Sequence, residues 1–69
     1  MMESKILAVL ASDKNRYHSQ STIITKILGY DATKNPDCWG ENSVALINLI
    51  RQGKVKELCQ PYESFFKIA

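Results

Sequence analysis

Apolar residues recur at helical spacing in three parts of this sequence. In the first part, Ile6, Leu7 and Leu10 share one face of a 3.6-residue period, which predicts a helix over Glu3–Ser12. Glu3 then lies in the first turn, where a carboxylate interacts favourably with the helix dipole. The polar residues that follow are typical of a turn, so we expect the helix to end there.

The second apolar stripe predicts a helix over Ser21–Leu28, with Ser19 or Ser21 as the N-cap and Gly29 as the residue that ends it. Just before this helix, Tyr17 is a candidate for a short strand. The stripe that we expect to be buried consists of Ile23, Ile24, Ile27 and Leu28.

Tyr30–Gly40 lacks a periodic apolar pattern, and we expect it to be an insertion before the third helix. Asn35 followed by Pro36 is typical of an N-cap and first helical residue, so a short helical turn is expected there. Gly40 either breaks that turn or starts the next helix. Trp39 is expected to cover the core, and the alternative is an exposed anchor for a partner.

The third apolar stripe predicts a helix over Glu41–Gln52 whose buried face is formed by Ala45, Leu46 and Leu49. Val44 and Ile47 lie on another side of this helix. A helix that is apolar on two sides is either buried on both sides or has an exposed apolar face that favours association. Two alternatives therefore remain: the inserted segment covers Val44 and Ile47, or these side chains form an exposed apolar surface.

A two-residue alternation replaces the helical period after Gly53. It predicts strands over Val55–Leu58 and Ser64–Ile68, joined by a tip at Gln60–Glu63, with Phe66 and Ile68 facing inward. The predicted fold is α+β: a winged helix-turn-helix with three helices followed by a two- or three-stranded antiparallel wing. At 69 residues the chain, 1–69, is expected to be one domain.

Composition narrows the range of functions. The net charge of +2 and pI near 8.6 permit a polyanion partner without requiring one. No apolar run has the length of a membrane span, and no signal peptide is evident. We therefore expect no membrane association and an intracellular location, cytoplasmic or nuclear. Cys38, Cys59 and His18 lack the paired spacing of a zinc site, so no metal is expected.

Catalytic motifs are not found in the sequence, which has no nucleophile elbow, phosphate loop, metalloprotease motif or dinucleotide fingerprint. A single histidine without a partner carboxylate is a poor acid–base centre. We therefore expect a protein that is not an enzyme, with no catalytic residue and no cofactor.

The order of helices and wing, with Leu46, Leu49, Gly53 and Val55 at their spacing, resembles the winged helix-turn-helix superfamily. The spacing is most similar to Zα-type domains, which bind left-handed Z-form DNA or RNA. Further matches are the Ile6-Leu7 pair, Leu28-Gly29 and Phe66-Lys67-Ile68.

The resemblance implies where the functional residues of that family would fall. Its recognition-helix Asn, its Arg or Lys, and its Tyr fall on Ser43, Val44 and Ile47, and its wing Pro and Trp fall on Pro61 and Phe66. Because the three helix positions differ in type, the resemblance implies the fold more directly than Z-form recognition.

The leading functional prediction is binding of double-stranded nucleic acid, including Z-form DNA or RNA, by helix 41–52 and wing 54–68. The alternative is a protein-interaction or homodimerisation module that uses Trp39, Val44 and Ile47. The candidate nucleic-acid-binding residues are Asn42, Ser43, Ile47, Asn48, Arg51, Lys54, Lys56, Pro61 and Phe66.

Overall fold

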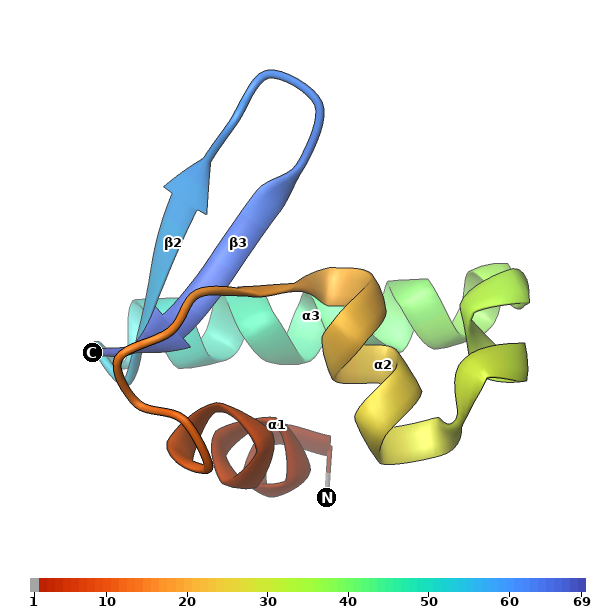
Figure 1. Cartoon of the computed structure of the whole chain (residues 1–69), viewed down its shortest axis with the longest axis horizontal. Helices are drawn as coiled ribbons and strands as arrows, with labels where there is room; N and C mark the ends of the chain where they lie inside the picture. Colours follow the sequence, from red (N-terminus) through yellow and green to blue (C-terminus); the bar gives the residue numbers. More distant parts are fainter. Residues whose placement is uncertain (1) are drawn as a thin grey trace.

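A computed structural model of the chain describes residues 2–69. Three α-helices pack beside a three-stranded antiparallel sheet of order β1-β3-β2, in which β1 lies between α1 and α2 and the β2–β3 hairpin follows α3 (Figure 1). This arrangement confirms the α+β winged helix-turn-helix. The elements are α1 (Met2–Ala11), β1 (His18–Ser19), α2 (Gln20–Leu28), the 3-10 helix η1 (Tyr30–Lys34), α3 (Pro36–Arg51), β2 (Val55–Cys59) and β3 (Ser64–Ile68).

The core lies where the three helices meet the base of the wing. Each helix buries the apolar face that its spacing predicts, and burial of such side chains is the main stabilising term in a small domain. Leu28 is an exception, because it is 45% exposed rather than buried. The main cluster consists of Ile6, Leu10, Ile23, Ala45, Leu46, Leu49, Val55 and Phe66.

Local hydrogen bonds fix both ends of α2. The Ser19 hydroxyl accepts from the Thr22 backbone N–H at 3.2 Å, which confirms Ser19 as the N-cap. At the other end, Gly29 has φ of 94°, and its N–H donates to the Thr25 carbonyl at 2.9 Å. A positive φ is strained for residues with a side chain, so glycine suits this position.

The predicted start of the third helix is wrong. Helix α3 begins at Pro36 rather than Glu41, and Gly40 lies inside it. The Asn35 side-chain oxygen accepts from the Asp37 N–H at 2.9 Å, and Pro36 occupies the first turn. This cap and the tertiary contacts outweigh the cost of an internal glycine, about 1 kcal/mol. The expected insertion is therefore reduced to η1.

Trp39 joins η1 to the first turns of α3. Its indole N–H donates to the Thr33 carbonyl at 2.7 Å, and its own carbonyl accepts from the Gln20 side chain at 3.3 Å. The side chain is half-buried and is not among those that pack against the main cluster. Trp39 therefore does not cover the core as expected, but holds the corner between η1 and α3.

The wing is three-stranded because the link after α1 adds a short strand. That strand, β1, begins at His18, one residue beyond the predicted Tyr17, and pairs His18 with Phe66. Strands β2 and β3 form a hairpin that projects from the helices (Figure 1). Phe66 faces the core, and Ile68 packs against it, which confirms the predicted alternation.

Candidate nucleic-acid interface

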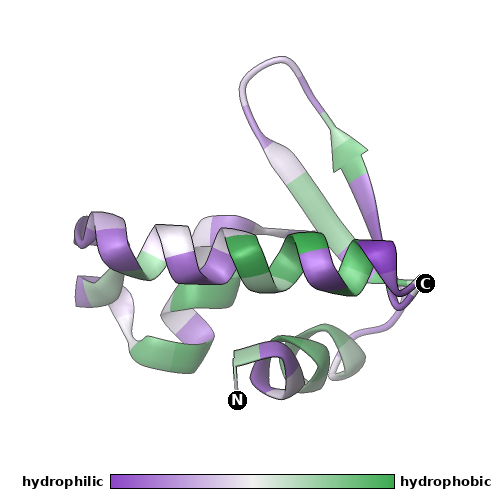
Figure 2. Cartoon of the chain, turned by 180° about the vertical axis from the view of Figure 1, so that it is seen from behind, coloured by the Kyte–Doolittle hydropathy of each residue, from purple (hydrophilic) through white to green (hydrophobic). Residues whose placement is uncertain are grey.

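The outward side of α3 is apolar at its centre. Val44 is 60% and Ile47 is 49% exposed, so of the two alternatives the structure shows the exposed apolar surface, not cover by the inserted segment. Gly40 and Arg51 are exposed on the same side, at the spacing that aligns residues along a helix. We call Gly40, Val44, Ile47 and Arg51 the α3 outer stripe. Figure 2 shows hydrophobic segments in the middle of α3 on the side turned to the viewer.

Two of the predicted binding residues are buried. Asn42 is 0% exposed because it lies on the same helical face as Ala45, Leu46 and Leu49. Phe66 is 5% exposed because it belongs to the core. Neither side chain reaches the surface in this structure, so neither is placed to contact a duplex.

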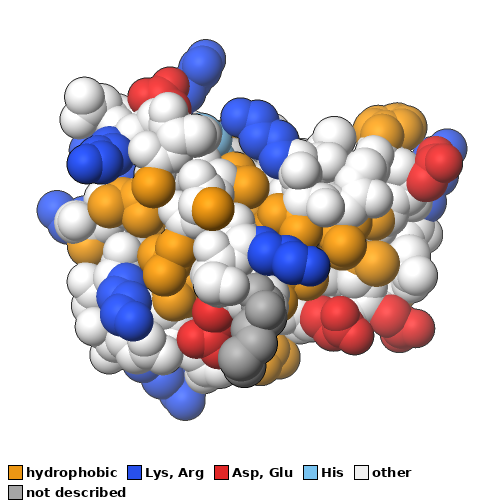
Figure 3. Space-filling model, turned by 90° about the horizontal axis from the view of Figure 1, so that it is seen from below, with side chains coloured by type: hydrophobic (Ala, Val, Ile, Leu, Met, Phe, Trp, Pro, Cys, Tyr) orange, Lys and Arg blue, Asp and Glu red, His pale blue; other side chains and the backbone are white. Residues whose placement is uncertain are grey.

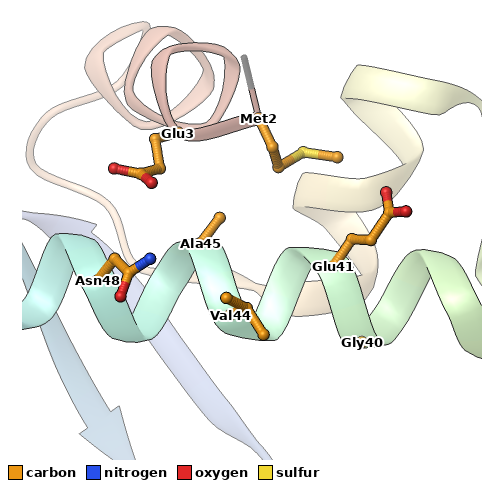
Figure 4. A pocket seen from close by; sticks show the side chains of 7 residues that line it. All are labelled: Met2, Glu3, Gly40, Glu41, Val44, Ala45 and Asn48. Carbon is orange, nitrogen blue, oxygen red and sulfur yellow. The ribbon is translucent and has the colours of Figure 1, made fainter.

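Two others are half-buried. The Ser43 hydroxyl accepts from the Gln20 side-chain amide at 2.9 Å. Asn48 is half-buried and lines a hollow of about 610 Å³ between α1 and α3. In Figure 4, Met2 and Glu3 of α1 lie across this hollow from α3.

The remaining predicted residues are exposed but do not form one cluster. Ile47 and Arg51 belong to the α3 outer stripe. Lys54 lines a small hollow against α1, together with Glu3, Ser4, Leu7 and Leu49. Lys56 lies on the wing, and Pro61 lies at its tip. The structure therefore divides the predicted site among several surfaces.

The wing sheet brings together a different set of side chains on the face turned away from α3. Lys56 pairs directly with Lys67, and Leu58 pairs with Phe65. The Lys67 ammonium lies 5.3 Å from the centroid of the Tyr17 ring, a cation–π contact. Tyr17 and Leu58 are 38% and 39% exposed. We call Tyr17, Lys56, Leu58, Phe65 and Lys67 the basic wing face.

Two further cations border the basic wing face. Arg16 and Lys26 are exposed and line a hollow of about 360 Å³ together with Tyr17 and Phe65. Asp13 is the one acidic residue in the lining of that hollow. Glu57 lies on the opposite side of the sheet, where it lines a hollow with Ser43, Ile47 and other residues. The basic wing face and its border thus collect four of the nine Lys and Arg residues.

Sequence reasoning counted Lys67 with Lys56 among the donors available on the wing, but it did not include Tyr17 or Phe65 among the binding residues. The alternation of strand residues was a usable signal for Lys56 and Lys67, because paired positions share a face of the sheet. Tyr17 gave only a weak signal, since its place beside Lys67 depends on β1 joining the sheet.

Residues 2–69 contain neither a metal-binding cluster nor a membrane-spanning helix. No three His, Cys, Asp or Glu side chains are grouped there in a way that could hold a metal ion. The helices of this part of the chain are too short or too polar to cross a membrane.

Comparison with known proteins gives no relative. No model of a protein family matches the chain, and neither a curated protein nor a solved structure matches it.

Proposed function

We propose that this chain binds nucleic acid through backbone phosphates, using the basic wing face. The observation that carries the proposal is the direct pairing of Lys56 with Lys67 on an exposed side of the sheet. Like charges in directly opposite positions destabilise a sheet. A bound polyanion neutralises them, so the arrangement becomes favourable in a complex.

The surroundings of this lysine pair support a nucleic-acid ligand. Arg16 and Lys26 extend the positive surface from the wing to the α1–α2 turn and to α2. Tyr17 adds an aromatic ring next to Lys67. Cations that are spread over separate elements suit a broad, regularly charged ligand, and duplex DNA carries about one charge per 1.7 Å of its axis.

The proposed binding has no preference for base sequence or for the left-handed form. Phosphate contacts position a protein without reading sequence, which is read at the base edges. The exposed centre of α3 offers Val44 and Ile47, which form no side-chain hydrogen bonds. Ser43, the position that resembles the Zα recognition Asn, is engaged by Gln20.

Salt dependence tests this proposal. Four phosphate contacts give a slope of log K against log salt of about −3.6 between about 50 and 200 mM salt, because each contributes about −0.9. Replacing Lys56 and Lys67 by Gln is expected to remove about half of that slope and to weaken binding. The measurement is fluorescence anisotropy of a labelled mixed-sequence duplex.

Lys34→Gln is the matched control, because Lys34 is an exposed cation on η1, far from the wing (Figure 1). It removes one positive charge and is expected to leave the salt slope unchanged. The single variant Lys56→Gln is the comparison for this control, and an equal loss of affinity in Lys34→Gln and in Lys56→Gln would contradict a localised site. No binding by the unaltered chain at low salt would contradict the proposed function.

The α3 outer stripe favours a second candidate function, association with another protein. Its apolar centre is exposed where a DNA-reading helix needs polar side chains.

A further inference from the structure

We propose that the α3 outer stripe is the interface of a homodimer in which two copies of α3 pack antiparallel about a two-fold axis. The basic wing face takes no part in this contact, so the inference does not depend on nucleic-acid binding.

The first argument is the exposed apolar surface. Val44 and Ile47 are 60% and 49% exposed at the middle of a helix of 16 residues. The adjoining hollow of about 610 Å³ includes Met2, Ala45 and Val44 in its lining, which adds apolar surface beside the stripe (Figure 4). Contiguous exposed apolar surface on a small domain commonly marks an interaction site.

The second argument is Gly40, which the single chain does not explain. A Cβ at this position would meet nothing within 4 Å, so the packing of one chain leaves room for a side chain. Within a helix, glycine costs about 0.5–1 kcal/mol relative to alanine. A second helix lying against the outer stripe would explain the glycine at this position, because glycine allows a side chain of the partner to lie close to the backbone.

The third argument is charge, and it identifies the occupant as a second copy. Asp37 and Glu41 lie in the first half of α3, whereas Arg51 and Lys54 lie at and just beyond its end. Figure 3 shows acidic side chains at the lower right of the molecule, and basic side chains with one acidic group at the lower left. A two-fold interface has to be complementary to itself. When a second α3 runs in the opposite direction, the acidic start of each helix lies opposite the basic end of the other.

An antiparallel register follows from these positions. When Val44 of one chain lies opposite Ile47 of the other, Gly40 lies opposite Arg51. The arginine stem then crosses the exposed helix backbone at Gly40, and its guanidinium reaches the carboxylate of Glu41 or Asp37. A parallel pair would place like charges together at both ends, which disfavours it.

The contact is small, so the expected dimer is weak. One helix pair lies at the low end of protein interfaces, below about 1,200 Å² in total, where complexes are transient. Sedimentation equilibrium up to about 1 mM protein is therefore the measurement, since weak association has a dissociation constant in the micromolar to millimolar range. The average mass is expected to rise from 7.8 kDa toward twice that value.

Two single variants test the location of the interface. Ile47→Glu places a carboxylate in the apolar centre and is expected to weaken association about tenfold or more, as loss of a central contact does. Leu28→Glu is the matched control, because Leu28 is 45% exposed at the end of α2. It is expected to dimerise like the unaltered chain, and far-UV circular dichroism checks that both variants fold.

A charge exchange tests the antiparallel register. Glu41→Lys and Arg51→Glu are each expected to weaken association, because each creates a like-charged pair across the interface. The double variant restores opposite charges and is expected to recover most of the lost affinity.

Three outcomes would overturn the proposal: a chain that stays monomeric at the highest concentration, an equal effect of Leu28→Glu and Ile47→Glu, or a double variant no better than the single ones.

Discussion

Asn42 is a polar side chain on the buried face of α3. It was expected on the binding side of the third helix, yet it is 0% exposed among apolar residues of α3. Within residues 2–69, neither its Nδ2 nor its Oδ1 has a hydrogen-bond partner. A buried amide without partners costs free energy, because it loses its hydrogen bonds to water on folding.

Replacing Asn42 by Leu, which has the same number and branching of side-chain heavy atoms, removes that cost. The free energy of unfolding is expected to rise by about 1–3 kcal/mol, the penalty for an unsatisfied buried polar group. Urea denaturation followed by circular dichroism measures the change. Asn48→Leu, at a half-buried position of the same helix, is expected to have a smaller effect. A loss of stability in Asn42→Leu would show that its amide contributes favourably to the fold.

At the scale of single elements, the helices, caps and strands that depend on residues nearby in the sequence were predictable. The helical periods of α1 and α2, the cap at Ser19 and the alternation in β2 and β3 all act over a few residues, and all are present. The start of α3 was not predictable in this way. The Asn35–Pro36 signal was visible, but Gly40 is usually unfavourable within a helix, and the contacts that hold this turn come from η1 and α2.

The cap at Asn35 gives a direct test of the longer helix. Asn35→Ala removes the acceptor for the Asp37 N–H and is expected to lower the free energy of unfolding by about 0.5–2 kcal/mol. Thermal or urea denaturation measures this loss. Asn15→Ala, at an exposed position in the turn after α1, is expected to change stability by less than about 0.5 kcal/mol. Equal effects of the two variants would argue that α3 does not depend on this cap.

At the scale of the whole molecule, two faces with different chemistry lie on different elements. The α3 outer stripe is apolar at its centre, with acidic and basic ends, and the basic wing face carries paired lysines beside an aromatic ring. This arrangement allows a dimer to form through α3 while both wings remain free for nucleic acid.

The candidate site was only partly predictable from the sequence, because its residues come from several elements. Lys56 and Lys67 follow from strand alternation, but the addition of Tyr17, Arg16 and Lys26 depends on how β1 and α2 pack against β3. Such long-range pairing is a property of the tertiary structure, and local spacing does not reveal it.

The most direct test of the account is an NMR titration of the chain with a mixed-sequence duplex at low salt, with a CG-repeat duplex in parallel. We expect the amide shifts to concentrate at Tyr17, Lys56, Phe65 and Lys67, to weaken with salt, and to be alike for the two duplexes. Shifts confined to Ser43–Arg51 of α3, or a clear preference for the CG repeat, would contradict backbone binding by the basic wing face.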